Sequence, residues 1–313
     1  YDFDTQQLQL KGLKLAAEAH GPGLPADVTK LTVTTDAEIK LAESQYRLSK
    51  LKLIAALRGD KLPGKQLDAT LGADVALDLK KGALSVAPLS LEAWDVKIKG
   101  ALQGRGLLET PRFTGTLNVG DFNARELLGH FSSTPLNTAD KQALASVSAD
   151  LEFNASTSDA ELAKLDAKLD QTRITGKASI KNFAHPAYRF QLALDNIDAD
   201  RYLPPATAAN AKPATPAAAA GAGAAELPLE TLRALDVDGT LAIGKLKIAK
   251  LQVNDIKVGV NANAGVIRAN PLAAQLYGGS YRGDLALDAR GAAVQLAMNE
   301  SLTNNEIGPL TQD

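Results

Sequence analysis

The chain has 313 residues, and 34 Lys and Arg face 36 Asp and Glu, so its net charge is -2. That balance argues against the basic footprint of a nucleic-acid-binding protein, and the absence of cysteine excludes disulfides and thiolate metal sites. No apolar run approaches the roughly 18 residues that span a bilayer, so any membrane anchor is expected outside this chain, which begins at Tyr1 like a processed protein or a fragment.

Aliphatic residues occupy every second position in short runs along the chain. The runs lie at 31–33, 71–79, 113–119, 147–153, 174–180, 188–194, 256–260, 285–287 and 294–298. Alternate residues of a strand point to the same side, so each run predicts a strand with one apolar and one polar face. Gly, Pro, Asp and Asn between the runs favour turns. The pattern predicts a mainly β fold of consecutive antiparallel strands.

Helical signals are few and short. In residues 123–131, Asn123 is placed to cap a helix, Glu126 holds the capping-box position and Gly129 is expected to end it. A second short helix is predicted at 228–235, where Pro comes first and Leu recurs every third residue. Residues 138–145 are a candidate for a third.

A segment rich in alanine and proline divides the chain. In residues 206–225, 12 of 20 residues are Ala, interspersed with Pro and Gly. Such a segment buries too little apolar area to offset its ordering entropy. We therefore predict a β region over 1–203, a flexible linker over 204–226, and a continuation of the β region over 227–313. An Ala-rich helix is the weaker alternative, because of the prolines.

An internal repeat links residues 82–102 with residues 265–285. Gly, Pro, Leu, an aromatic residue and a second Gly recur without gaps at an offset of 183, and Val75 and Leu77 match Val258 and Val260 at the same offset. The favoured interpretation is a pair of duplicated β-hairpins. The alternative is a repeated ligand pocket at Trp94 and Tyr277, although aromatic residues more often pack.

Motifs of catalysis and metal binding are missing. The nucleophile elbow G-x-S-x-G and the P-loop do not occur, and His20, His130 and His185 have no zinc-binding spacing. Residues 195–200 resemble part of a calcium loop, but Arg201 follows where a Gly turn is needed, so a solvated strand end is expected. The lysines of 245–250 indicate a solvated strand face, with anionic headgroup contact as the weaker alternative. We expect a non-enzymatic protein without metal or cofactor.

From about residue 66 onward, the chain resembles the AsmA family of Gram-negative envelope proteins, in particular its C-terminal periplasmic portion. The resemblance lies in FTGTLNVGDFNARELL (113–128), KNFAHPAYRF (181–190), LDNIDADRYLPP (194–205), LPLETLRALDVDGTL (227–241) and PLAAQLYGG (271–279). It implies a periplasmic protein tethered to the inner membrane by an N-terminal helix and linked to outer-membrane biogenesis. It also implies a long curled antiparallel sheet with an apolar groove along which phospholipids move, and no catalytic residues.

The pattern and the resemblance together predict lipid binding or conduction. An exposed acyl chain of roughly 15 methylenes costs about 12 kcal/mol in water, and an aliphatic groove removes most of that cost. The alternative is a structural or regulatory module with a closed apolar core that recruits outer-membrane assembly proteins. The expected partners are thus phospholipid acyl chains, a membrane reached through the anchor, and possible assembly proteins, but no nucleic acid. The candidate groove-lining residues are Val75, Leu77, Leu117, Val119, Leu151, Phe153, Phe190, Leu192, Leu194, Ile256, Val258, Val260, Leu285 and Leu287.

Overall fold

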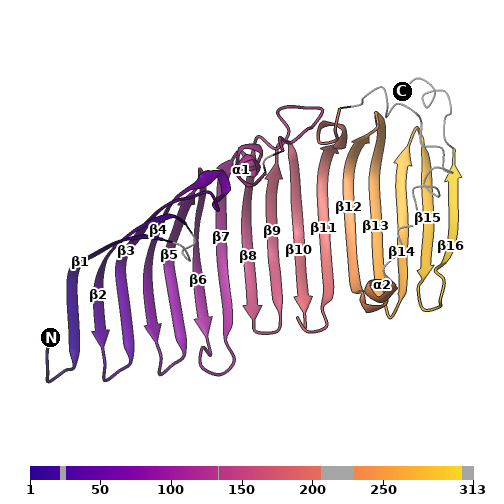
Figure 1. Cartoon of the computed structure of the whole chain (residues 1–313). Helices are drawn as coiled ribbons and strands as arrows, with labels where there is room; N and C mark the ends of the chain where they lie inside the picture. The colour runs from indigo at the N-terminus through magenta and orange to yellow at the C-terminus, as the bar shows by residue number, and fades with distance from the viewer. Residues whose placement is uncertain (22–25, 133, 206–228, 305–313) are drawn as a thin grey trace. The chain divides into compact units, whose positions relative to one another are not determined.

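The computed structural model describes residues 1–21, 26–132, 134–205 and 229–304. These residues contain sixteen strands and two α-helices (Figure 1), which confirms the predicted mainly β class with short helices. They divide into two compact units, each treated by itself here. The first unit holds residues 1–136 and 144–170, and the second unit holds residues 137–143 and those from 171 onward.

The first unit is one antiparallel sheet in which every strand pairs with its neighbour in the sequence. A short 3₁₀ turn, η1 (Pro63–Lys65), precedes the fourth strand, and helix α1 (Ala124–Phe131) follows the seventh. The strands are β1 (Gln7–His20), β2 (Val28–Lys40), β3 (Gln45–Arg58), β4 (Gln66–Asp78), β5 (Ala83–Ala93), β6 (Val96–Arg105), β7 (Arg112–Phe122), β8 (Val147–Ser156) and β9 (Ala160–Leu169).

The second unit is also a sheet in chain order, with one exception to the expected antiparallel pairing. Strands β11 and β12 run parallel, and the connection between them includes η2 (Ala199–Arg201) and α2 (Leu229–Ala234). The linker expected at 204–226 lies almost wholly in 206–228, outside the described residues, so it and the predicted domain limits stay predictions. The strands are β10 (Thr172–Lys181), β11 (Ala187–Asp198), β12 (Asp236–Ile248), β13 (Leu251–Asn263), β14 (Val266–Leu276), β15 (Gly279–Asp288) and β16 (Gln295–Thr303).

Carboxylates support the bulges of the long strands in the first unit. The register of β1 against β2 shifts between Leu10 and Leu13, where Gly12 has a φ of 61° and its N–H donates to Asp36 Oδ1 at 2.7 Å. In β3, Lys50 has a φ of 54°, and its N–H donates in the same way to Asp74 Oδ1 at 2.6 Å. Because a bulge bends its strand, these sites account for the bend of β1 to β4 partway along their length in Figure 1.

The predicted hairpin repeat is present in the backbone. Strands β14 and β15 begin and end exactly 183 residues after β5 and β6, as comparison of their bounds shows. Both hairpins turn through two residues of positive φ, Trp94 and Asp95 in one, and Tyr277 and Gly278 in the other, as the primed two-residue turns require.

The preceding strands do not keep the offset of 183 residues. Four residues connect β4 to β5, whereas two connect β13 to β14. Val75 of β4 pairs with Val86 of β5. The residue of β14 that corresponds to Val86 in the repeat is Ala269, and it pairs with Val260 of β13. The residues that match Val75 and Leu77 in sequence therefore do not occupy the equivalent positions in the sheet, because the offset of the preceding strands differs by two residues.

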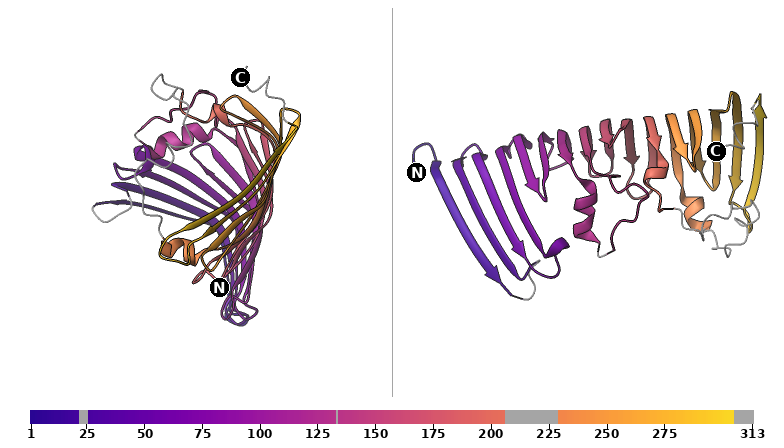
Figure 2. Two further views of the ribbon diagram at one scale, coloured as in Figure 1. Left: turned by 90° about the vertical axis from the view of Figure 1, so that its right-hand side faces the viewer. Right: turned by 90° about the horizontal axis from the view of Figure 1, so that it is seen from above.

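Helix α1 lies beside the strands of the first unit (Figure 2). Its predicted cap is confirmed, since the Asn123 side chain accepts from the Glu126 N–H at 3.2 Å. Gly129 does not end the helix, which continues to Phe131, because one interior glycine costs only about 1 kcal/mol. Trp94 packs edge-on against Phe131, with ring centroids 5.3 Å apart.

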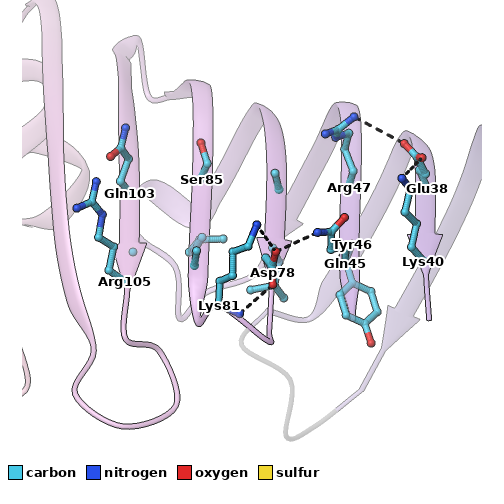
Figure 3. Close-up of a pocket in the computed structure, with 15 residues that line it drawn as sticks. Glu38, Lys40, Gln45, Tyr46, Arg47, Asp78, Lys81, Ser85, Gln103 and Arg105 are labelled. Atoms are coloured by element: carbon cyan, nitrogen blue, oxygen red, sulfur yellow. Dashed lines mark hydrogen bonds and ion pairs between the residues drawn. The ribbon is translucent and has the colours of Figure 1, made fainter. Parts of the chain in front are cut away.

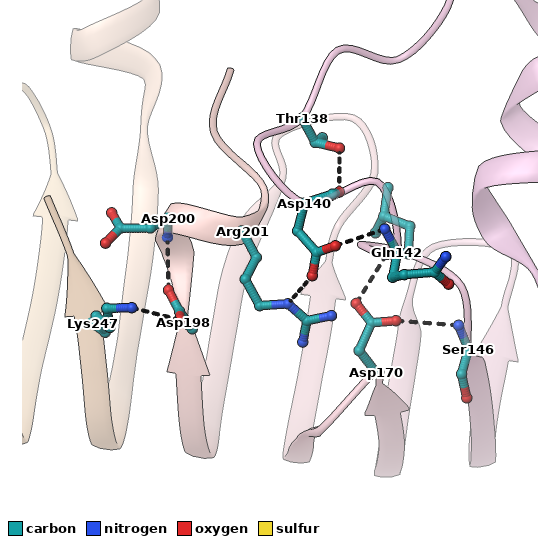
Figure 4. Close-up of polar contacts among 10 residues, drawn as sticks. Thr138, Asp140, Gln142, Ser146, Asp170, Asp198, Asp200, Arg201 and Lys247 are labelled. Carbon is teal, nitrogen blue, oxygen red and sulfur yellow. Dashed lines mark hydrogen bonds and ion pairs between the residues drawn. The ribbon is translucent and has the colours of Figure 1, made fainter. Parts of the chain in front are cut away.

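The other two helix predictions differ in outcome. Residues 229–234 form α2, as expected, while the proline at 228 lies outside the described residues. Residues 138–145 form turns rather than a helix, so the third helix was wrong. The Arg201 guanidinium bonds Asp140 Oδ2 at 2.7 Å (Figure 4). The Ala139 N–H donates to the Leu203 carbonyl, and these contacts hold the segment in extended and turn conformations.

The bulge carboxylates give a prediction that depends on pH. The N–H of Gly12, and then Lys50, lower the pKa of Asp36 below its ordinary value. A carboxylate with a lowered folded-state pKa stabilises the fold fully above about pH 4 and loses that contribution as the pH falls through the lowered value. We expect Asp36→Ala to reduce the free energy of unfolding in urea at pH 7, and the deficit to shrink as the pH falls below about 4.

Glu43→Ala is the matched control, because Glu43 is an exposed turn residue whose side chain has no partner among the described residues. Unfolding followed by circular dichroism should leave this variant unchanged. Equal stability of Asp36→Ala and the wild type at pH 7 would rule out the support of the bulge by Asp36.

Candidate functional site

The six candidate residues of the first unit share one face of its sheet. We call a row the set of residues that lie opposite one another on successive strands, since such residues project to the same face. Val75 and Phe153 lie in one row, Leu117 and Leu151 in the next, Val119 and Leu77 in the two outer ones. From β3 to β9 the four rows are Leu53, Leu71, Leu91, Ile98, Val119, Ala149 and Ala167; Leu51, Ala73, Leu89, Gly100, Leu117, Leu151 and Leu165; Leu48, Val75, Val86, Leu102, Gly115, Phe153 and Leu162; and Tyr46, Leu77, Leu84, Gly104, Phe113, Ala155 and Ala160.

The eight candidate residues of the second unit form rows in the same manner. They too are joined by strand register, including the parallel step from β11 to β12. The rows are Phe190, Gly239, Val260, Ala269, Leu285 and Met298; Leu192, Leu241, Val258, Leu272 and Gly283, which lies opposite Glu300 on β16; Leu194, Ile243 and Ile256; and Tyr188, Val237, Ala262, Ile267, Leu287 and Leu296. All fourteen residues predicted from the sequence therefore lie on apolar rows.

Within each unit, these rows have no second layer of protein over them. All fourteen candidate side chains are only half-buried, and the buried apolar residues among those described are all alanines, such as Ala55, Ala73 and Ala262. Two sheets packed face to face bury the Leu and Val of their inner faces in a common core. No such core forms within either unit among the described residues, so each unit presents an open apolar face.

Phenylalanine rings lie over glycines on this face. Phe153 is directly opposite Gly115, Phe113 opposite Gly104, and Phe190 opposite Gly239. A Cβ placed on Gly115 would come within 2.6 Å of the Phe153 ring, and one on Gly104 within 3.1 Å of the Phe113 ring. Each ring therefore occupies the space above a glycine and lies along the sheet. The sequence pattern alone missed this pairing, because it depends on register across strands.

The opposite face is polar and carries exposed ion pairs. Examples are Lys164 with Glu152 at 3.4 Å and Arg189 with Asp236 at 2.7 Å. Exposed pairs of this kind contribute about 0–1 kcal/mol each to stability. The polar side chains keep this face wet, while the sheet ladder and the apolar rows hold the fold.

The carboxylates that resembled a calcium loop have structural partners instead. Asp198 caps η2 and contacts Lys247 Nζ at 3.1 Å (Figure 4). Asp200 accepts the Lys250 N–H at 2.9 Å. These bonds fasten the end of β11 to the turn between β12 and β13. No group of three His, Asp or Glu side chains that could hold a metal occurs in the part of the chain that the structure describes.

Each of the three histidines has its own contacts. His20 contacts Glu18 at 3.0 Å, and His130 stacks on Trp94 with ring centroids 6.3 Å apart. The His185 N–H donates to the Asn182 carbonyl in a turn. None of these contacts brings two histidines together.

The glycine beneath a ring gives a test of this face by substitution. We expect Gly115→Ala to lower the free energy of unfolding by about 1–3 kcal/mol, because its Cβ would press on the Ala101 carbonyl oxygen at 2.6 Å as well as on Phe153. Gly129→Ala is the control: no atom lies within 4 Å of its Cβ, and Ala in a helix interior should raise stability by up to about 1 kcal/mol. Urea unfolding of both variants checks the opposite signs, and a neutral Gly115→Ala would contradict the tight pairing.

Comparison with known proteins adds one finding. The family model described as AsmA family matches residues 7–313. No curated protein and no solved structure matches the chain. Among the described residues, no helix combines the length and the apolar character needed to cross a membrane.

Proposed function

Because this chain belongs to the AsmA family, we propose that its open apolar face binds phospholipid acyl chains and conducts them during outer-membrane biogenesis. Membership of the family suggests a role related to envelope biogenesis and lipid transport. The observation that supports the finer proposal is the set of continuous apolar rows without a second layer. A large exposed apolar patch on a soluble protein marks a site for a partner protein, a membrane or a ligand.

The chemistry of the rows suits acyl chains better than a polar ligand. Most of the side chains are Leu, Val, Ile and Ala, with phenylalanine rings that lie along the sheet. Each methylene removed from water contributes about 0.8 kcal/mol, and the contact has no preferred direction. A chain can therefore shift from one strand to the next and exchange similar contacts, as conduction requires.

The remaining parts of the proposal follow the family resemblance. We place the protein in the periplasm, tethered to the inner membrane by an anchor outside these residues. We assign it no catalytic residue and no cofactor, because its candidate residues are aliphatic and aromatic. The apolar face itself is the functional site.

Site-specific photo-crosslinking in cells tests the occupancy of the face. A photoreactive residue in place of Leu192 or Leu117 should form phospholipid adducts that mass spectrometry detects. The adjacent exposed positions Gln191 and Asn118 project to the polar face and serve as matched controls. Equal labelling of the two faces, or no adduct at Leu192 and Leu117 in folded protein, would reject the proposal.

A charge on the face separates an open site from a closed core. Leu194 lies opposite Ile243 and is half-buried, so a lysine at this position can extend its ammonium group to water. We expect Leu194→Lys to lower the free energy of unfolding by less than the 2–5 kcal/mol typical of core truncation. We expect it to reduce lipid adducts at Leu192 several-fold, whereas Ala193→Lys, on the polar face, should not. Global unfolding of Leu194→Lys with Ala193→Lys intact would favour the closed-core interpretation.

A further inference from the structure

A second site lies in the first unit, in a hollow at the ends of β2 to β6 (Figure 3). The hollow has a volume of about 400 Å³. It arises where short side chains meet across strands, since Ala76 lies opposite Ser85 in the middle of a row of longer ones. Arg47 continues that row on one side and Gln103 on the other. These four residues alternate with the apolar rows, so their side chains project to the polar face.

The walls of the hollow carry an excess of positive charge. Four cations, Lys40, Arg47, Lys81 and Arg105, and two carboxylates, Glu38 and Asp78, line it, which leaves 4 − 2 = 2 positive charges. Both carboxylates are already engaged: Glu38 lies 3.9 Å from Lys40 and 3.7 Å from Arg47, and Asp78 lies 3.5 Å from Lys81. Gln45 Nε2 also donates to Asp78 Oδ2 at 3.0 Å.

The unbalanced positive charge of the hollow lies at Arg105. No carboxylate among the described residues pairs with its guanidinium, and its partner across β6 and β7 is a second arginine, Arg112. Like charges directly opposite one another destabilise a sheet. An anion bound in the hollow would relieve that repulsion. The Ser85 hydroxyl and the Gln103 amide, which bond to no other described residue, supply neutral donors beside it.

We propose that this hollow binds a phosphate group. Guanidinium groups recognise phosphate oxygens through paired N–H donors, and a phosphate monoester carries close to two negative charges, which matches the excess in the walls. The side chains of Arg47, Ser85 and Gln103 project to the polar face, so the proposal does not rest on lipid binding by the apolar rows. Inorganic phosphate and the headgroup of a phosphomonoester lipid share this chemistry, and either could be the source of the group.

Titration of the whole chain with inorganic phosphate at low salt, followed by calorimetry or NMR, tests the site. We expect saturable binding that weakens with added salt, as for any partly exposed ion contact. Loss of a hydrogen bond to a charged group should make Arg47→Gln and Arg105→Gln each bind about tenfold more weakly. Arg58→Gln is the control: it lies on the same strand as Arg47, already pairs with Asp68 at 2.8 Å, and should leave phosphate binding unchanged.

Vesicles distinguish the two sources. If the natural ligand is a headgroup, phosphatidic acid vesicles should displace phosphate and bind in an Arg105-dependent way, while phosphatidylcholine vesicles should not. If the binding of inorganic phosphate depends on Arg105 but the binding of vesicles does not, the ligand is inorganic phosphate or another small phosphate compound. Absence of saturable phosphate binding by the folded wild type, or equal binding by wild type, Arg47→Gln and Arg105→Gln, would overturn the proposal.

Discussion

Backbone hydrogen bonding between strands that follow one another in the chain is the interaction on which each unit depends. A single layer cannot rely on a core between layers, so the ladders and the contacts along each row must hold the sheet together. The buried apolar side chains among the described residues are accordingly all alanines. The register of the ladders decides which side chains meet, and hence the composition of each row.

The same alternation that builds the apolar face builds a second surface of different chemistry behind it. Val75 belongs to an apolar row, while Ala76 beside it belongs to the hollow on the polar face. A shift of register by one residue would exchange the two surfaces. Two local features accompany this arrangement. The bulges supported by carboxylates bend the strands, and the glycines opposite phenylalanines leave space for the rings on the apolar face.

Much of this fold could be predicted from the sequence, because alternation is a property of single strands. Leu117 and Leu151 were predicted to share a face, and they lie opposite each other. Features that depend on two distant segments could not be predicted in this way. Nothing in the pattern of β12 indicates that it runs parallel to β11, and the pairing of Phe153 with Gly115 requires the register of β7 and β8. The hollow at Ser85 was missed for the same reason.

Pairing between neighbours in the sequence also has a consequence for how such a chain folds and evolves. Within the first unit every ladder joins strands that follow one another in the chain, and a topology of such neighbouring pairings is associated with fast folding. A sheet of this kind can grow by one hairpin at a time. The recurrence of β5 and β6 as β14 and β15 is what gene-level duplication of such a hairpin would leave. The length of the apolar face can thus change in steps of two strands, while the alternation that defines it is preserved.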